Sequence, residues 1–261
     1  MNSRILITGA SAGIGRATAL ACAAAGAQPV LVARSADALD ALVADITQLH
    51  GITAVALPCD VRDVGRLQSL LQEEDDRAPI DHIVANAGVG MYGPFATAQW
   101  AQIDDVLRTN IDGALAPVHA LLARMLSRRR GSIVFVSSVL GKRALAWNAV
   151  YSASKHALHG LADALRLEVS THGIHVGVVC PGRTRTQFQT RMHTSAAPSR
   201  RRAVPEASPG EVAAAIVGCI TRRRREVVVP YSSLAYTLVG VHVPRLADIL
   251  LSRAVPRPHG H

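Results

Sequence analysis

Short apolar stretches alternate with longer amphipathic segments along most of the chain. The apolar stretches have the length of β-strands and are rich in valine and isoleucine; they cover residues 4–8, 29–33, 53–58, 81–85, 131–138, 174–180 and 226–230. Several are continuously apolar instead of alternating, which is typical of strands buried on both faces of a parallel sheet. The pattern therefore predicts a parallel β-sheet with both faces covered.

The segments between these strands have the periodicity of helices. We expect helices over residues 13–25, 36–49, 64–72, 100–126 and 210–221, and one more that contains Tyr151 and ends near residue 170. Such alternation of strands and helices predicts an α/β fold with a three-layer, doubly wound parallel sheet. No linker or repeat divides the chain, so we expect a single domain over residues 1–230.

Two segments depart from the alternation. Residues 183–209 are polar, rich in Pro and Ser and too long for an ordinary loop, which predicts a mobile lid over the site. Residues 231–261 form an apolar C-terminal extension, in which residues 244–254 predict a short amphipathic helix. We expect its apolar side to pack on the core or on an oligomer partner in preference to a membrane. That side would consist of Leu246, Ile249 and Leu250.

Composition and charge narrow the class of protein. With 261 residues, of which 49% are hydrophobic and 18% charged, the chain can bury a sizeable core. The formal net charge of +9 comes partly from short arginine runs at residues 128–130, 200–202 and 222–225, while only 3% of the residues are aromatic. Because the runs are far apart and base-stacking side chains are scarce, a solvated surface is favoured over nucleic-acid binding.

The sequence contains no signal for metal binding or export. The four cysteines show no CxxC spacing and the eleven histidines no HExxH motif, so no metal site is expected. The chain opens on a strand-like run without the features of a secretory signal, and it has no uninterrupted apolar run of about 18 residues. These features predict a cytoplasmic protein without a transmembrane helix.

A glycine-rich loop joins the first expected strand to the first expected helix. Gly9, Gly13 and Gly15 form a GxxxGxG pattern, with Ser11 and Ile14 between them. Glycines allow a tight turn and close backbone approach, and a helix N-terminus offers amides and a positive dipole to a pyrophosphate. The loop predicts a dinucleotide site, and the alternative is a tight turn without a ligand.

The end of the second expected strand bears on which dinucleotide binds. NAD sites usually carry an acidic residue there, which holds the ribose 2′-hydroxyl. This chain has Arg34 and Ser35 instead, and we expect the next acid, Asp37, to cap the following helix. Because a guanidinium suits a 2′-phosphate in charge and geometry, NADP(H) is predicted in preference to NAD(H).

Tyr151 and Lys155 stand four residues apart, and Lys155 is one of only two lysines in the chain. On a helix this spacing places both side chains on one face. An ammonium beside a phenol favours the phenolate, which lowers the pKa of the tyrosine. The pair is either an acid–base centre or an ordinary pair on the surface of an amphipathic helix.

Seven short motifs occur in one order along the chain. They are TGASAGIG at 8–15, CDV at 59–61, ANAG at 85–88, TNIDG at 109–113, VSS at 136–138, YSASK at 151–155 and PGRTRT at 181–186. With these motifs, the sequence over roughly residues 4–190 resembles the short-chain dehydrogenase/reductase family. The resemblance implies a Rossmann fold and an NADP-dependent oxidoreductase that transfers a hydride between the nicotinamide and a carbonyl or secondary alcohol.

The resemblance also implies roles for single residues. Tyr151 would be the general acid in carbonyl reduction and the general base in alcohol oxidation, and Lys155 with oxidised nicotinamide would lower its pKa from about 10. Lys155 would also bind the nicotinamide ribose, and Ser138, chosen over Ser137, would stabilise the substrate oxygen. Asn110 would hold a water that relays protons to Lys155. The cofactor would contact Gly9, Ser11, Gly13, Ile14, Gly15, Arg34, Asp60, Val61, Asn86, Ala87, Gly88, Tyr151, Lys155, Pro181, Gly182, Thr184 and Thr186.

Other functions stay open beside the NADP(H)-dependent oxidoreductase. In a β-ketoacyl-carrier-protein reductase, residues 128–130 could meet an acidic carrier. A non-catalytic dinucleotide-binding sensor could share the fold, although such proteins typically lose the Tyr or the Lys that this chain retains. The resemblance further implies a homodimer or homotetramer that acts on a small molecule.

Overall fold

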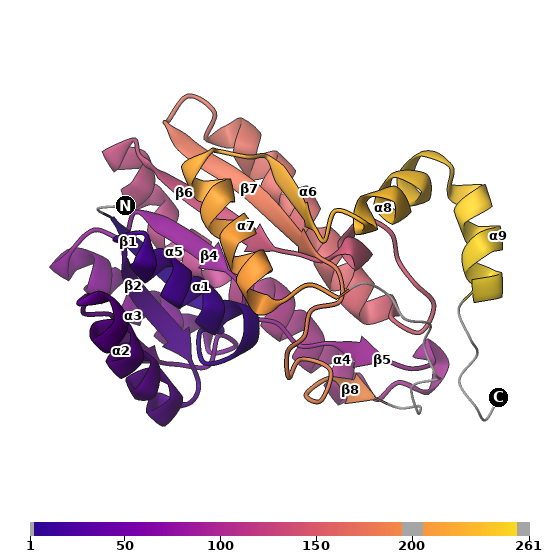
Figure 1. Cartoon of the computed structure of the whole chain (residues 1–261), viewed down its shortest axis with the longest axis horizontal. Coiled ribbons are helices and arrows are strands. Elements are labelled where there is room, and N and C mark those ends of the chain that lie inside the picture. Colours follow the sequence, from indigo (N-terminus) through magenta and orange to yellow (C-terminus); the bar gives the residue numbers. More distant parts are fainter. Residues whose placement is uncertain (1–2, 195–205, 255–261) are drawn as a thin grey trace.

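The computed structural model describes residues 3–194 and 206–254. Seven parallel strands form its central sheet (Figure 1). They are β1 Arg4–Thr8, β2 Gln28–Ala33, β3 Val55–Pro58, β4 His82–Ala85, β6 Gly131–Val136, β7 Ile174–Pro181 and β9 Glu226–Val229. The order in the sheet is β3-β2-β1-β4-β6-β7-β9, so the direction of winding reverses between β1 and β4. Ligands of such sheets bind at the carboxyl ends of the strands beside this switch point.

Helices cover both faces of the sheet, as the continuously apolar strands predict. One face carries α1 Gly13–Ala24, α2 Ala36–His50 and α7 Pro209–Thr221, and the other α3 Val64–Arg77, α5 Gly113–Arg128 and α6 Ala149–Glu168. Successive residues of β1 divide between the two cores, because Ile5 and Ile7 pack on the first face and Leu6 on the second. The predicted three-layer, doubly wound sheet of a Rossmann-type α/β domain is confirmed.

The long helix expected over residues 100–126 is interrupted in the middle. The structure has α4 Trp100–Leu107, a π-helical turn η2 Arg108–Asp112, and then α5. A π-turn inserts an extra residue into the helix, and such turns are frequent at functional sites. This turn carries Asn110, which is completely buried and faces the loop that follows β4.

The described ends of the expected lid are held against the body of the protein. β8 His193–Thr194 pairs with β5 Met91–Tyr92, and Thr184 forms a β-bridge with Ala207. Arg183 and Glu206 form an ion pair of 2.8 Å across the same two ends. Residues 195–205 of the expected lid lie outside the described part of the chain.

The C-terminal extension forms two helices, α8 Ser233–His242 and α9 Pro244–Ala254 (Figure 1). The Tyr236 hydroxyl donates a hydrogen bond to the Arg143 carbonyl at 2.8 Å, and the Arg143 guanidinium pairs with Asp248. Residues 255–261 of the extension lie outside the described part. Among the described residues, no helix has the length and apolar character needed to span a membrane.

The apolar side of α9 is about half exposed in the single chain, so its packing on the core or on an oligomer partner stays a prediction. The helix turns its other side inward, where Ala247 is buried. The three aliphatic side chains on its outer side are 47%, 50% and 52% exposed; they are Leu246, Ile249 and Leu250.

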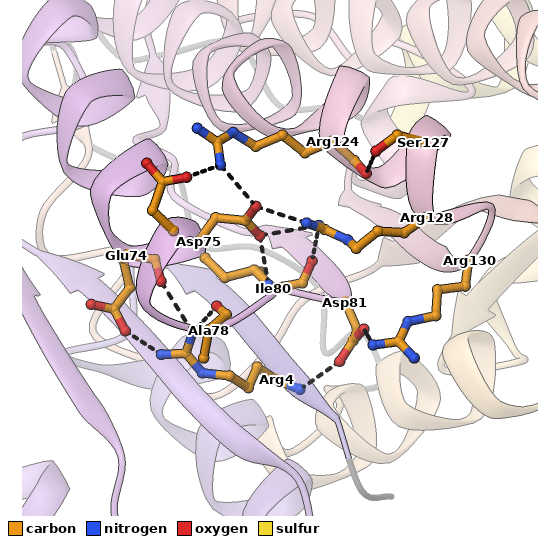
Figure 2. A network of polar contacts seen from close by, with 11 residues as sticks. Arg4, Glu74, Asp75, Ala78, Ile80, Asp81, Arg124, Ser127, Arg128 and Arg130 are labelled. Carbon is orange, nitrogen blue, oxygen red and sulfur yellow. Dashed lines mark hydrogen bonds and ion pairs between the residues drawn. The ribbon is translucent and has the colours of Figure 1, made fainter.

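A network of ion pairs joins the amino ends of β1, β4 and β6 to helices α3 and α5 (Figure 2). At its centre is Asp75, whose side chain is 1% exposed. Its two carboxylate oxygens accept hydrogen bonds from the guanidinium of Arg128 at 2.8 and 3.0 Å, and Oδ1 also accepts from the amide of Ile80 at 2.7 Å. Arg124 approaches the same carboxylate at 3.4 Å. A buried carboxylate needs this degree of pairing to offset its loss of hydration.

Removing the charge of Asp75 should therefore destabilise the fold. We expect Asp75→Asn to lower the free energy of unfolding by about 3–5 kcal/mol, because it leaves the half-buried guanidinium of Arg128 without its partner at a buried site. Urea unfolding monitored by circular dichroism measures the change. The matched control is Asp76→Asn, since the neighbouring Asp76 side chain is 63% exposed and should contribute far less. Equal losses in the two variants would contradict the role assigned to the buried network.

Candidate active site

The glycine loop leaves β1 in a backbone conformation that glycine adopts without strain. Gly9 has a φ of +67°. A β-carbon on Gly15 would lie 2.1 Å from the carbonyl oxygen of Gly9, so only glycine lets α1 begin this close to the loop. Ala12 at the N-cap provides no side-chain hydrogen bond to the amides of the first turn. The loop thus combines close backbone approach with uncapped helix amides, which fits the pyrophosphate of a dinucleotide.

The loop that follows β4 is tied directly to the glycine loop. The Thr8 hydroxyl accepts hydrogen bonds from the backbone amides of Asn86 and Ala87, both at 3.0 Å. In return, the side-chain amide of Asn86 donates to the carbonyl of Thr8 at 2.9 Å. Asn86, which the resemblance places under the adenine ribose, therefore uses its side chain to hold two loops together.

Charged residues gather where the adenosine end of a dinucleotide would lie. Asp60 follows β3, and the guanidinium of Arg62 hydrogen-bonds to its carboxylate at 2.6–3.1 Å. This hydrogen bond lowers the pKa of Asp60, and the charges of Arg62 and Arg34 add to the effect. Arg34 is exposed at the end of β2. Val61 is buried, and a β-carbon on Gly113 would lie 2.7 Å from its side chain.

The helix after Arg34 is capped by a different residue from the one expected. Ser35 is the N-cap of α2, and its hydroxyl accepts a hydrogen bond from the amide of Ala38 at 3.3 Å. Asp37 lies in the first turn, where its charge is favourable to the helix dipole. The expectation that Asp37 is the cap is wrong, because the helix begins at Ala36, two residues earlier than a cap at Asp37 requires.

Ser138 and Tyr151 meet at the carboxyl end of β6. Their side chains hydrogen-bond to each other, and the Ser138 hydroxyl donates to the carbonyl of Pro181 at 3.3 Å. Ser137 turns the opposite way and donates to the backbone carbonyl of Lys155 on α6 at 2.9 Å. The alternating sides of an extended strand therefore place Ser138, and not Ser137, beside the tyrosine.

Lys155 is buried behind Tyr151. Its side-chain nitrogen donates to the carbonyl of Val136 at 2.9 Å and lies 5.9 Å from the centre of the Tyr151 ring. A β-carbon on Gly88 would lie 3.3 Å from this nitrogen. Burial disfavours the ammonium and lowers the pKa of Lys155 to about 8. The lysine therefore titrates close to neutral pH.

The pKa of Tyr151 moves in the direction opposite to the expected one. Burial disfavours the phenolate and raises the pKa of the tyrosine to about 12, and the hydrogen bond with Ser138 opposes this only in part. The ammonium of Lys155 is 5.9 Å from the ring centre and binds the Val136 carbonyl. In the protein by itself the phenol thus remains protonated at neutral pH, which is the state a general acid requires.

Asn110 connects the π-helical turn η2 to the loop after β4 by hydrogen bonds. Its side-chain oxygen accepts from the amide of Val89 at 2.8 Å, while its amide nitrogen donates to the carbonyl of Val89 at 3.0 Å and to the hydroxyl of Ser154 at 2.9 Å. Both side-chain donors are engaged, so a relay water at Asn110 would bind an oxygen atom of the residue. Sequence reasoning missed Ser154, although it lies within the YSASK motif.

The first part of the lid lies across the catalytic residues. The ring of Phe188 is 5.8 Å from the ring of Tyr151, centre to centre, and its edge lies 2.9 Å from where a β-carbon of Gly90 would stand. A β-carbon of Gly13 would lie 3.2 Å from the methyl group of Thr186, so the lid also reaches the glycine loop. The Thr184 hydroxyl donates back to the carbonyl of Gly182 at 3.3 Å.

The structure thus brings the expected residues together along one edge of the sheet. The loop after β4 is bonded to the end of β1 through Asn86 and Thr8, and the loop after β6 to the end of β7 through Ser138 and Pro181. Arg34 and Asp60 lie farther along the same edge, after β2 and β3. This arrangement offers an anion cradle, a hydroxyl pair and a buried amine to one elongated ligand.

Comparison with known proteins agrees with this geometry. A family model described as short chain dehydrogenase matches residues 3–197. Ketoacyl reductase HetN of Nostoc sp. is 36% identical over 235 residues, which are 90% of this chain and 80% of that protein. The chain belongs to the short-chain dehydrogenase/reductase family.

Two solved structures are similar to the protein along most of its length. A short-chain dehydrogenase from Sphingobium yanoikuyae in complex with NADPH is 29% identical, with a TM-score of 0.80 over 95% of this chain and 96% of that one. A short chain dehydrogenase/reductase from Burkholderia phymatum in complex with NAD is 24% identical, with a TM-score of 0.81 over 100% and 98% of the two chains, and it shows the shared fold. The protein is therefore an oxidoreductase of a family that uses nicotinamide dinucleotides.

Proposed function

We propose that the protein is an NADP(H)-dependent reductase of a ketone or aldehyde, able to run in reverse as an alcohol dehydrogenase. The observation that carries this proposal is the contact of Ser138 with Tyr151. Lys155 is buried behind the tyrosine, and the glycine loop at the same edge of the sheet has uncapped helix amides. A non-catalytic sensor would have no need for this arrangement of hydroxyl, phenol and amine.

The state of each group favours proton donation to a substrate. When bound, NADPH supplies the hydride that adds to the carbonyl carbon. The phenol of Tyr151, with its pKa raised to about 12, donates its proton to the carbonyl oxygen, which the Ser138 hydroxyl holds. Lys155, with a pKa of about 8, returns a proton to the phenolate and regains its own from solvent along the Asn110 side. At the end of the cycle Tyr151 is again a neutral phenol, and the ammonium of Lys155 is the one buried charge of the pair, as it was at the start.

The choice of NADP(H) rests on Arg34. No acidic residue stands at the end of β2, and the exposed guanidinium of Arg34 lies close enough to Asp60 to contribute to its lowered pKa. A second guanidinium, that of Arg62, lines a cavity of about 610 Å³ with Asp60 and Arg108. The exposed guanidinium of Arg34 suits a 2′-phosphate and supports NADP(H) over NAD(H).

A ketoacyl substrate is the second candidate, and the similarity to a ketoacyl reductase favours it. The apolar lid side chains Phe188 and Met192, which both approach Gly90, suit an aliphatic group beside the reacting carbonyl. The position of the arginines at 128–130 gives no support to the alternative that they meet an acidic carrier beside the site. Arg128 is bound to Asp75, and the run precedes β6 at the end of the sheet opposite to the site.

Tyr151→Phe tests the proposed chemistry. We expect turnover with NADPH and a ketone or aldehyde to fall by at least about 100-fold, since the proton donor is lost, while NADPH binding stays close to that of the wild type. Steady-state NADPH oxidation and fluorescence titration measure the two effects. Tyr236→Phe, which removes a phenol of the C-terminal extension, is the control and should retain full turnover. Near-normal turnover of Tyr151→Phe would refute the mechanism.

Arg34→Ala tests the choice of cofactor. We expect NADPH binding to weaken by about 10–100-fold through the loss of a charge-assisted contact, and NADH binding to change little. Calorimetric titration with each dinucleotide gives both dissociation constants. Arg129→Ala, at the opposite end of the sheet, should alter neither. If Arg34→Ala weakens both cofactors equally, Arg34 does not bind the 2′-phosphate.

The pH dependence tests the role of Lys155. Below a pKa of about 8 the lysine carries its proton, and above it the ammonium is lost. The rate of reduction should therefore be high below about pH 8 and fall as the pH rises through this value, although Tyr151 itself stays protonated up to about pH 12. In Lys155→Arg, whose guanidinium keeps its charge, the inflection should disappear even where the rate is lower. A wild-type profile without a fall near pH 8 would contradict this role.

A further inference from the structure

A second group of chemically active side chains lies behind the catalytic residues. His159 comes from α6, Cys180 from the end of β7 and Glu226 from the start of β9. One potential ligand atom of each lies within 4.8 Å of those of the other two. Nε2 of His159 is 3.7 Å from the sulfur of Cys180, and Nδ1 is 3.8 Å from Oε2 of Glu226. None of the three belongs to the catalytic set.

We propose that His159, Cys180 and Glu226 bind a transition-metal cation of borderline softness, with Zn²⁺ as the best match. Imidazole nitrogen, thiolate sulfur and carboxylate oxygen are the donors that Zn²⁺ uses in proteins, and it binds them tetrahedrally at about 2.0–2.3 Å. Donor atoms in such a site are about 3.3–3.7 Å apart, by the tetrahedral angle. With one nitrogen of His159, the three ligand atoms lie within 4.8 Å of one another, so the side chains have to close by up to about 1 Å to reach this spacing.

Space for the metal and its fourth ligand lies beside the cluster. A cavity of about 280 Å³ is lined by His159 and Glu226, and also by Gly141, Lys142 and Val178. This volume is several times that of one water molecule, about 30 Å³. A water can thus complete the coordination shell, as it does in zinc sites with three protein ligands.

The protonation states of two ligands suit a metal. Burial lowers the pKa of His159 to about 4, so its imidazole is neutral and can donate a lone pair. Burial raises the pKa of the Cys180 thiol, and coordination would release its proton to solvent. The charge of Glu226 adds to this rise in pKa, and the charges of Lys142 and Lys155 oppose it only in part. One thiolate and one carboxylate then balance the two positive charges of Zn²⁺.

Lys142 is the competitor for this site. Its ammonium lies 2.8 Å from Oε2 of Glu226. A metal would bind Oε2 after this ammonium moves away, or it would bind the other carboxylate oxygen, Oε1. Asp163, Arg166 and Arg225 also line the cavity, and Asp163 pairs with both arginines. Removing the ammonium should therefore strengthen metal binding, whereas a cluster with only a structural role gives no reason for such a gain.

The experiment uses the full-length protein and two metal ions, without any need for turnover. Titration with Co²⁺ should produce a sulfur-to-cobalt charge-transfer absorption with a stoichiometry of one, and Zn²⁺ should displace the cobalt. Cys180→Ser should abolish the band. His159→Gln and Glu226→Gln should weaken Zn²⁺ binding by more than the roughly 10–100-fold typical of lost outer-shell partners.

Matched variants separate this site from others. Cys22→Ala removes a buried cysteine of α1, and His156→Gln an exposed histidine of α6; both should bind Co²⁺ and Zn²⁺ as the wild type does. Lys142→Met should bind Zn²⁺ more tightly than the wild type. If Cys180→Ser does not fold, as judged by circular dichroism, His159→Gln and Lys142→Met decide the question.

Three outcomes would overturn the proposal. The first is the absence of a charge-transfer band in the wild type, and the second is a band that persists in Cys180→Ser. The third is Zn²⁺ affinity that changes in neither His159→Gln nor Lys142→Met. Because every readout is metal binding, these results are independent of whether the proposed reductase activity is found.

Discussion

The common direction of all seven strands is the constraint on which the rest of the structure depends. Parallel strands require a helical crossover after each strand, which covers both faces of the sheet and turns every strand into a buried apolar segment. The same constraint brings all carboxyl ends to one edge. The glycine loop, Arg34, Asp60, Asn86 and Ser138 each follow a different strand and still form one surface. Their hydrogen bonds to one another, above all those of Thr8 and Asn86, then lock the loops in place.

Burial at this edge sets the chemistry of the side chains that line it. Loss of hydration raises the pKa of Tyr151 to about 12 and lowers that of Lys155 to about 8. Both shifts favour the neutral forms, so the phenol keeps its proton and the ammonium gives up its proton more readily. The same effect lowers the pKa of His159 to about 4 and leaves its imidazole neutral. One physical cause thus shifts the pKa values of the Tyr151–Lys155 pair and of the cluster behind it.

The two clusters share structural elements. Lys155 and His159 lie one turn apart on α6, and Cys180 directly precedes Pro181, whose carbonyl receives the Ser138 hydrogen bond. The thiol of Cys180 is also close enough to Lys155 that each affects the pKa of the other. A change at the second cluster therefore has a short path to the catalytic amine, through one residue of β7 and one turn of α6.

The sequence by itself determined the layers of the fold, the glycine loop and the Tyr151–Lys155 pair, because each depends on spacing within a short segment. Apolar runs, a turn and a helical repeat are local properties. Tertiary structure alone decided the π-turn that carries Asn110, since a single inserted residue leaves the segment helical on both sides and marks no boundary in the sequence. It also reversed the expected shift of Tyr151, because desolvation by residues distant in the sequence outweighs a charge 5.9 Å from the ring centre. Likewise, His159, Cys180 and Glu226 meet only because parallel strands and a crossover helix bring three remote segments together.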